Sequence, residues 1–192
     1  MRRTLTIVTA VLAGVVALGG TAAAAPERRG IPDRVMLQPA DLGGAATGPV
    51  EAGLPHPLLP QPCADTPVPQ PVAARSLAAD YSPRHRVYEN VARYRPGGAQ
   101  AYVNALKEQL HRCKAGGDEV GFVPVAEDHL GPDTVLFLGT YDEGDRSVAY
   151  VAAAVGRYVV VVMVADPVVG AGDPTMANTF ASRAMLRAAA GK

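Results

Sequence analysis

The stretch that decides the fold is Ser147-Val-Ala-Tyr-Val-Ala-Ala-Ala-Val155, followed by Gly156-Arg157 and then Tyr158-Val-Val-Val-Val-Met-Val-Ala165. Two apolar runs of strand length are joined by two residues, the first of which is glycine, as in a type II′ β-hairpin. The second run is apolar on both faces, so we expect it to be a central strand. A membrane-spanning segment over both runs is the alternative, but it would place the charge of Arg157 in lipid.

Further strands and two helices flank this hairpin. Segments with strand texture, separated by turn residues, cover Val72–Tyr81, Arg84–Arg95, Val120–Ala126 and Thr134–Tyr141. Apolar residues from Ala99 to Cys113 recur at spacings of three and four, which predicts an amphipathic helix. Asp173-Pro174 predicts the N-cap and first residue of a second helix. The order ββαββββα predicts an α+β domain, an antiparallel sheet of about six strands with two main helices packed on it.

Proline is concentrated before this domain. Eleven of the 17 prolines lie between Pro26 and Pro71, and each lacks the amide donor that a helix interior or a central strand uses. We therefore expect residues 25–71 to form an extended N-terminal arm, with one helical turn around Gln38–Gly43. Residues 72–192 are expected to form the α+β domain.

The first 24 residues are typical of a secretory signal peptide. Arg2 and Arg3 precede an apolar stretch, and the small residues of Ala22-x-Ala24 fit a cleavage site after Ala24. We expect cleavage there and release of the mature protein outside the cell, without membrane insertion. An uncleaved membrane anchor is the alternative, although the apolar stretch is shorter than the ~20 residues of a bilayer-spanning helix.

Cys63 and Cys113 are the only cysteines. In an exported chain two cysteines most often pair, so we expect a disulfide that fastens the arm to the domain. A cysteine nucleophile is the alternative, but it would leave the second thiol without a role in an oxidising compartment.

The sequence carries few signs of catalysis. No serine stands in a G-x-S-x-G motif, no H-E-x-x-H occurs, and the four histidines lack metal-ligand spacing. Gly170-Ala171-Gly172 follows an apolar strand and precedes a helix, as a dinucleotide-binding turn does, but Thr175 stands at the third glycine position. We therefore predict no catalytic residues, no metal and no cofactor. Basic and acidic residues number 18 each, so no excess of positive charge indicates nucleic acid.

Charge is nevertheless unevenly distributed. Residues 75–114 hold eight basic side chains and three acidic ones, whereas residues 118–145 hold eight acids and no lysine or arginine. Either the two segments neutralise each other, or the basic one forms a groove for an anionic ligand. Alternation along the second strand places Arg86, Tyr88 and Tyr94 on one face, opposite Val91 and Arg95, so these three are the predicted ligand-binding residues. If the tyrosines are core residues instead, Arg86 is expected to pair with an acid of residues 118–145.

Four features of the chain resemble one family. They are the signal peptide, the segment Val35-Met36-Leu37-x-Pro39-x-Asp41-Leu42, Cys63 after a Pro-rich stretch, and Val87-x-Glu89-x-Val91-x-x-Tyr94 before a helix that ends in Leu110-x-x-Cys113. Over residues 33–190 the chain resembles the PknH-like extracellular sensor domain of actinobacterial exported proteins. That resemblance implies an antiparallel sheet with helices, braced by disulfides, and a cleft for an unidentified ligand. The chain departs from it in having no kinase, and one cysteine pair where the kinase member has two disulfides.

The function that these observations favour is a secreted, non-catalytic, sensor-like domain that binds an unknown small molecule or a cell-envelope component. Two alternatives stay open. One is an exported enzyme, such as a hydrolase, with a site assembled from dispersed residues; the other is a cell-envelope protein-interaction module that uses the Pro-rich arm. A hydrogen-bonded His–carboxylate pair in a cleft would favour the enzyme. The ligand and the oligomeric state do not follow from the sequence.

Overall fold

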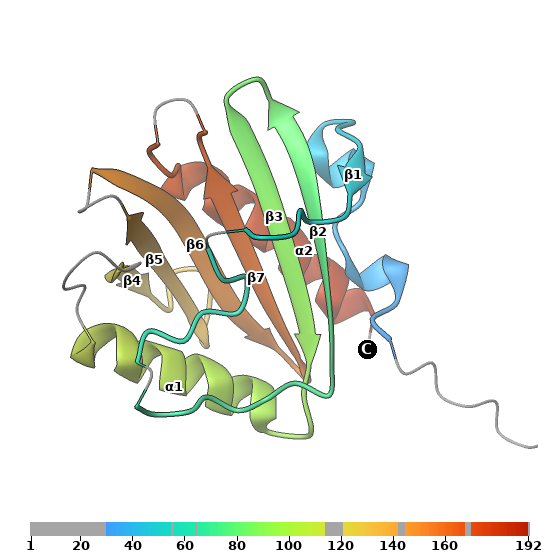
Figure 1. Cartoon of the computed structure of the whole chain (residues 1–192). Helices are drawn as coiled ribbons and strands as arrows, with labels where there is room; N and C mark the ends of the chain where they lie inside the picture. The colour runs from blue at the N-terminus through green and yellow to red at the C-terminus, as the bar shows by residue number, and fades with distance from the viewer. Residues whose placement is uncertain are drawn as a thin grey trace, which may run out of the picture.

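The computed structural model describes residues 30–54, 56–63, 65–113, 121–141, 145–167 and 170–191. Its centre is a seven-stranded sheet in the order β1-β2-β3-β7-β6-β5-β4, with every neighbouring pair antiparallel (Figure 1). The strands are β1 (Thr47–Gly48), β2 (Ala73–Ser82), β3 (His85–Arg93), β4 (Gly121–Glu127), β5 (Thr134–Tyr141), β6 (Arg146–Val155) and β7 (Tyr158–Ala165). The helices are α1 (Gly98–Arg112), α2 (Pro174–Ala190) and two 3₁₀ turns, η1 (Asp33–Val35) and η2 (Pro39–Leu42). The predicted α+β class is confirmed, whereas the predicted signal peptide, residues 1–24, lies outside the described residues.

The strand β7 lies in the middle of the sheet, between β3 and β6, as its apolar run predicts. Val160 and Val162 point into the core on one face, and Val159 and Val161 point into the core on the other. Because both faces are covered, the strand needs apolar residues at every position. The turn that joins β6 to β7 is confirmed, with Gly156 at a φ of +64°, in the region that glycine adopts without strain.

Two hydrophobic cores lie on opposite faces of the sheet. The helix α2 packs over β6 and β7 on one face, and α1 packs over β4 to β7 on the other (Figure 1). Leucines of the arm, among them Leu54, Leu58 and Leu59, pack against the α1-side core, so the arm completes that layer. None of the described helices is both long and apolar enough to cross a bilayer.

The arm carries more regular structure than the sequence predicts. The expected helical turn is confirmed as η2, where the Gln38 amide donates to the Asp41 carboxylate at 2.8 Å. The strand β1 is additional, and it pairs Thr47 and Gly48 with the middle of β2. Two residues between Ala46 and Pro49 show no strand periodicity, so this strand exists only because the edge of β2 lies beside it.

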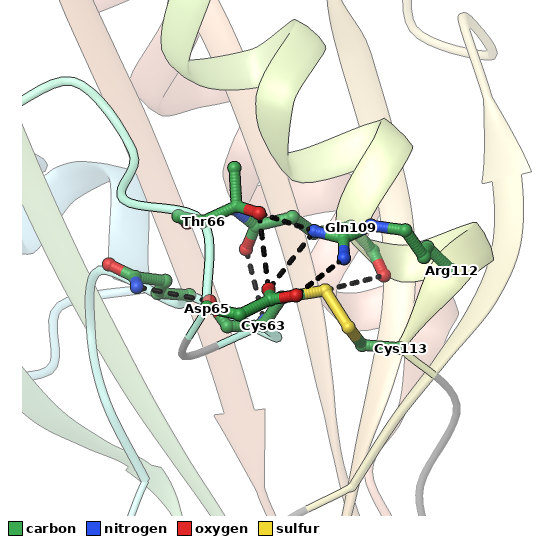
Figure 2. Close-up of polar contacts among 7 residues, drawn as sticks. Cys63, Asp65, Thr66, Gln109, Arg112 and Cys113 are labelled. Carbon is green, nitrogen blue, oxygen red and sulfur yellow. Dashed lines mark hydrogen bonds and ion pairs between the residues drawn. A yellow bond between two sulfur atoms is a disulfide. The ribbon is translucent and has the colours of Figure 1, made fainter.

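The predicted disulfide fastens the arm to α1. Cys63 and Cys113 are joined, with their Cα atoms 5.6 Å apart, and Figure 2 shows Gln109 beside them. The Gln109 side chain accepts a hydrogen bond from the Cys63 amide at 3.1 Å and donates one to the Thr66 carbonyl at 2.7 Å. The disulfide and this buried amide therefore hold the same stretch of arm.

Two tyrosine hydroxyls of the domain donate hydrogen bonds to proline carbonyls of the arm. The Tyr102 hydroxyl donates to the Pro60 carbonyl at 2.8 Å, and the Tyr150 hydroxyl donates to the Pro57 carbonyl at 3.2 Å. Since a proline carbonyl still accepts, tyrosines on α1 and β6 hold the arm where ladder hydrogen bonds are not possible.

Gly172 lies where the segment before α2 passes closest to β6. A Cβ added at this position would overlap the Ala149 amide nitrogen and the Val148 carbonyl carbon, which are backbone atoms of β6. The Gly172 amide also donates to the Ser147 hydroxyl at 3.3 Å. Close backbone packing therefore accounts for a glycine that resembles part of a dinucleotide-binding turn.

The variant Gly172→Ala is expected to lower the free energy of unfolding by about 2–3 kcal/mol, because the added methyl forces α2 away from β6. Gly30→Ala is the matched control, since a Cβ there meets nothing within 4 Å. Urea denaturation of both variants measures the difference. Equal unfolding midpoints would show that the segment before α2 adjusts at no cost.

Candidate functional site

The three predicted ligand-binding residues lie on the α1 side of the sheet, at different depths. Tyr88 is 6% exposed and Tyr94 is 2% exposed, and both belong to the α1-side core. The Tyr94 ring centroid lies 5.8 Å from that of Tyr102, and burial raises the pKa of the Tyr94 hydroxyl. Alternation places these residues on the expected face, while binding by them stays a prediction.

Arg86 lies at the rim of this face, where the arm meets it. Its guanidinium pairs with Glu51 of the arm, and its Nε lies 3.3 Å from the Asp80 carboxylate of β2. The guanidinium carbon stands 5.6 Å from the centroid of the Tyr88 ring, in a cation–π contact. Both acidic partners lie outside residues 118–145, and they already occupy the side chain predicted to bind an anion.

Neutralisation between the basic and the acidic segments is partial. Lys107 of α1 lies 2.6 Å from the Asp128 carboxylate, which joins the two segments. Other basic side chains pair with acids elsewhere in the chain: Arg75 with Asp33, Arg84 with Asp166 and Arg112 with Asp65. The basic side chains of residues 75–114 are therefore distributed over several surfaces of the protein. One of these surfaces contains a pocket.

A pocket of about 650 Å³ lies at one end of the sheet, beside Gly191, the residue that follows α2. We call it the basic pocket. Its lining includes Asp33, Arg34, Arg75, Arg93, Arg157 and Tyr158. The lining thus includes the last residue of β3 and the first residue of β7, and in Figure 1 these two strand ends lie close to the C-terminal mark. The described lining of the pocket therefore holds four arginines and one acidic side chain, Asp33.

Separate elements bring the four arginines together. Arg34 lies in η1, Arg75 on β2 and Arg157 in the turn between β6 and β7, while Arg93 is the last residue of β3. The antiparallel register places Arg93 opposite Tyr158, the first residue of β7. Two of these arginines, Arg75 and Arg93, belong to the basic segment of the sequence. Nothing local marks Arg34 or Arg157, because only the fold brings the arm and the turn to the same end of the sheet.

The electrostatics of the basic pocket favour an anion. Arg75 pairs with Asp33 and donates to the Ile31 carbonyl at 3.4 Å. Within the described part of the chain, Arg34 and Arg157 form no ion pair, and both are exposed. Guanidinium groups stay protonated at physiological pH and present planar forks of donors, which match carboxylate and phosphate oxygens.

The outer wall of the basic pocket, residues 30–34, is tied to the sheet shortly after η1. The Leu37 amide donates to the Glu89 carboxyl at 2.8 Å, and Glu89, on β3, is 0% exposed. Burial raises the pKa of Glu89 to about 8, although the Leu37 hydrogen bond lowers it. Farther along the arm, Arg187 of α2 pairs with Asp41 of η2 at 2.9 Å. The wall is therefore held in place before any ligand arrives.

Other clusters of reactive side chains lie elsewhere. His111 and Glu127 form a His–carboxylate pair at 2.6 Å, but the His111 side chain is 65% exposed, and neither residue lines the basic pocket. Cys63, Asp65 and Cys113 lie close enough together to hold a metal ion. Both sulfurs of that group are joined in the disulfide, however, and a metal would need thiolates.

No protein-family model matches this chain, and no curated protein matches it. Among solved structures, the chain is similar to the extracellular domain of PknH from Mycobacterium tuberculosis, with 13% sequence identity and a TM-score of 0.45. The similarity covers 62% of this chain and 64% of that chain, so it spans less than two thirds of the relative. A likeness of this size assigns the chain to no family.

Proposed function

We propose that this protein is a secreted, non-catalytic, sensor-like domain that binds an anionic ligand in the basic pocket. The observation that carries the proposal is the convergence of four arginines, from η1, β2, β3 and the β6–β7 turn, on one pocket with a single acidic side chain in its described lining. Its volume falls within the range of roughly 300–1,000 Å³ that is typical of small-molecule sites. A small molecule or a cell-envelope component that carries carboxylate or phosphate groups fits this lining.

Secretion is supported by the sequence of residues 1–24 and by the disulfide. Structural disulfides form and persist in oxidising compartments outside the cytosol. We therefore propose cleavage after Ala24 and release of the mature chain. Sequencing the N-terminus of protein from the culture supernatant tests this, and recovery from membranes alone with Met1 still present would contradict it.

The absence of catalysis is proposed from the chemistry of the pocket lining. Arginine has no lone pair available for proton abstraction or nucleophilic attack at physiological pH. The pair that could do acid–base work, His111 and Glu127, lies on the exposed end of α1 and on β4, outside the basic pocket. The lining therefore supports recognition of an anion rather than its conversion.

The face carrying Arg86, Tyr88 and Tyr94 is our second candidate site for the same function. The cation–π contact between Arg86 and Tyr88 supports it, because the pair combines a donor fork with an apolar surface. An anion at Arg86 would have to compete with Glu51 and Asp80. That competition makes the basic pocket the stronger of the two candidates.

Isothermal titration with sodium pyrophosphate and with citrate tests the basic pocket. We expect the native protein to bind at least one of these anions at a single site. The double variant Arg34→Ala/Arg157→Ala is expected to weaken that binding tenfold or more, since a hydrogen bond to a charged group contributes roughly 1.5–3 kcal/mol. Binding should also weaken as salt is added, because both arginines are exposed.

The matched control is Arg95→Ala, which removes the same charge from an exposed position that does not line the pocket. Its affinity is expected to equal that of the native protein. Arg86→Ala and Tyr88→Ala report on the second candidate site. Native affinity in the folded Arg34→Ala/Arg157→Ala protein would remove the basic pocket, and loss in Arg86→Ala alone would move the site to the α1 face.

A further inference from the structure

The outer edge of β2 is covered over only part of its length. Its inner edge pairs with β3 from Ala73 to Ser82, whereas β1 pairs with the outer edge only at Ala78 and Ala79. Among the described residues, no strand lies on the outer side of residues 73–77. An uncovered strand edge presents backbone donors and acceptors that can pair with another extended chain.

This open edge continues from the basic pocket. A second cavity, of about 340 Å³, is lined by Thr47, Gly48 and Pro49 from the arm and by Arg75, Ser76 and Leu77 from β2. Arg75 lines both cavities. Arg75 therefore connects the basic pocket, at one end of this edge, with the cavity beside β1 at the other.

We propose that the anionic ligand is an acidic peptide, which adds to the open edge of β2 as a strand and places a carboxylate in the basic pocket. This inference rests on the proposed function and names its ligand class. Residues 73–77 span about 17 Å at the rise of a β-strand, enough for five residues of a bound chain. Backbone hydrogen bonds would supply affinity along the edge, and the arginines would select for negative charge at its end.

Small side chains at the start of β2 allow the backbone of a bound peptide to approach this edge closely. Ala74 is exposed and Ala73 is half-buried, and their methyl groups leave room for a neighbouring backbone. No proline occurs within β2, so its outward amides are available as donors. Arg75 is the one charged side chain of residues 73–77, and its positive charge favours an acidic partner.

The test uses the N-acetylated peptide Val-Glu-Val-Glu-Val-Glu with a free C-terminus and two isomers of equal charge, one N-methylated at its three valine amides and one at its three glutamate amides. Methylation of the set that faces β2 removes the donors to its edge. One isomer is therefore expected to bind at least about tenfold more weakly than the parent peptide. A C-terminally amidated version separates the terminal carboxylate from the glutamate side chains as the group that enters the pocket.

Amide hydrogen exchange of the mature protein provides the second measurement. The parent peptide should slow exchange at alternate residues between 73 and 77, and pyrophosphate should leave these amides unchanged. Equal affinity of the parent and both methylated isomers, or unchanged exchange, would overturn the peptide proposal. If pyrophosphate still binds in that case, the proposed function stands with a small anion as ligand, and if neither probe binds, both proposals fail.

Discussion

The protein is expected to lose about 4 kcal/mol of stability between pH 4.5 and pH 8 because of Glu89 alone. Burial raises the pKa of Glu89 from 4.5 to about 8. Between these values the folded state keeps a proton that the unfolded state has released, so the free energy of unfolding falls by roughly 1.4 kcal/mol per pH unit. The stabilising contribution is complete below pH 4.5 and is lost as the pH rises to 8.

Urea denaturation across this pH range tests the effect. The variant Glu89→Gln carries no titratable group and can still accept from the Leu37 amide, so most of the slope should disappear. Glu108→Gln makes the same change on the exposed surface of α1 and should retain it. Hydrogen bonds from Arg112 and Lys107 lower the pKa values of Asp65 and Asp128, so these acids take up protons only below the pH range of the experiment. Parallel curves for the native and Glu89→Gln proteins would contradict the assignment.

Replacing both cysteines, Cys63→Ser with Cys113→Ser, is expected to lower the free energy of unfolding by about 4 kcal/mol. The disulfide closes a loop with a sequence separation of 50 residues, and a loop of this length constrains the unfolded chain by about that amount. The arm has few ladder hydrogen bonds of its own, so we expect its contacts with α1 to loosen first. Urea denaturation at neutral pH measures the loss.

Reduction provides the control for this experiment. Dithiothreitol should bring the native protein down to the stability of the double variant and should leave the variant itself unchanged. Two titratable thiols in the native protein, or equal stability of the native and variant proteins, would show that the bond does not brace the arm.

The sheet could be predicted where its signals are local. The apolar run of β7 and the glycine of its hairpin lie within one stretch of chain, and both are found as expected. The start of α2 is equally local, because the Asp173 carboxylate accepts from the Met176 amide at 2.9 Å as an N-cap. The strand β1 escaped prediction because its two residues are a strand only beside Ala78 and Ala79 of β2.

The candidate site could not be predicted, for a related reason. Alternation places Arg86 and Tyr88 on one face of β3 but does not show what covers that face. In the structure Glu51 of the arm pairs with Arg86, and Tyr88 is buried in the α1-side core. The basic pocket needs Arg34 of the arm beside Arg157 of a turn, and only the register of the whole sheet brings them to one end. The charge of residues 75–114 left an anion-binding groove as one of two interpretations, beside neutralisation by residues 118–145, and it did not locate a pocket.

The anion is proposed to bind among the arginines at the end of the sheet. Two-dimensional ¹⁵N NMR spectra of the protein, recorded during addition of sodium pyrophosphate, test this proposal residue by residue, because each amide reports its own surroundings. Saturable shifts should be largest at Arg34, Arg93, Arg157 and Tyr158 and should be absent at Lys107 on α1. Shifts centred on Arg86 and Tyr88, or no saturable shift at all, would contradict the claim.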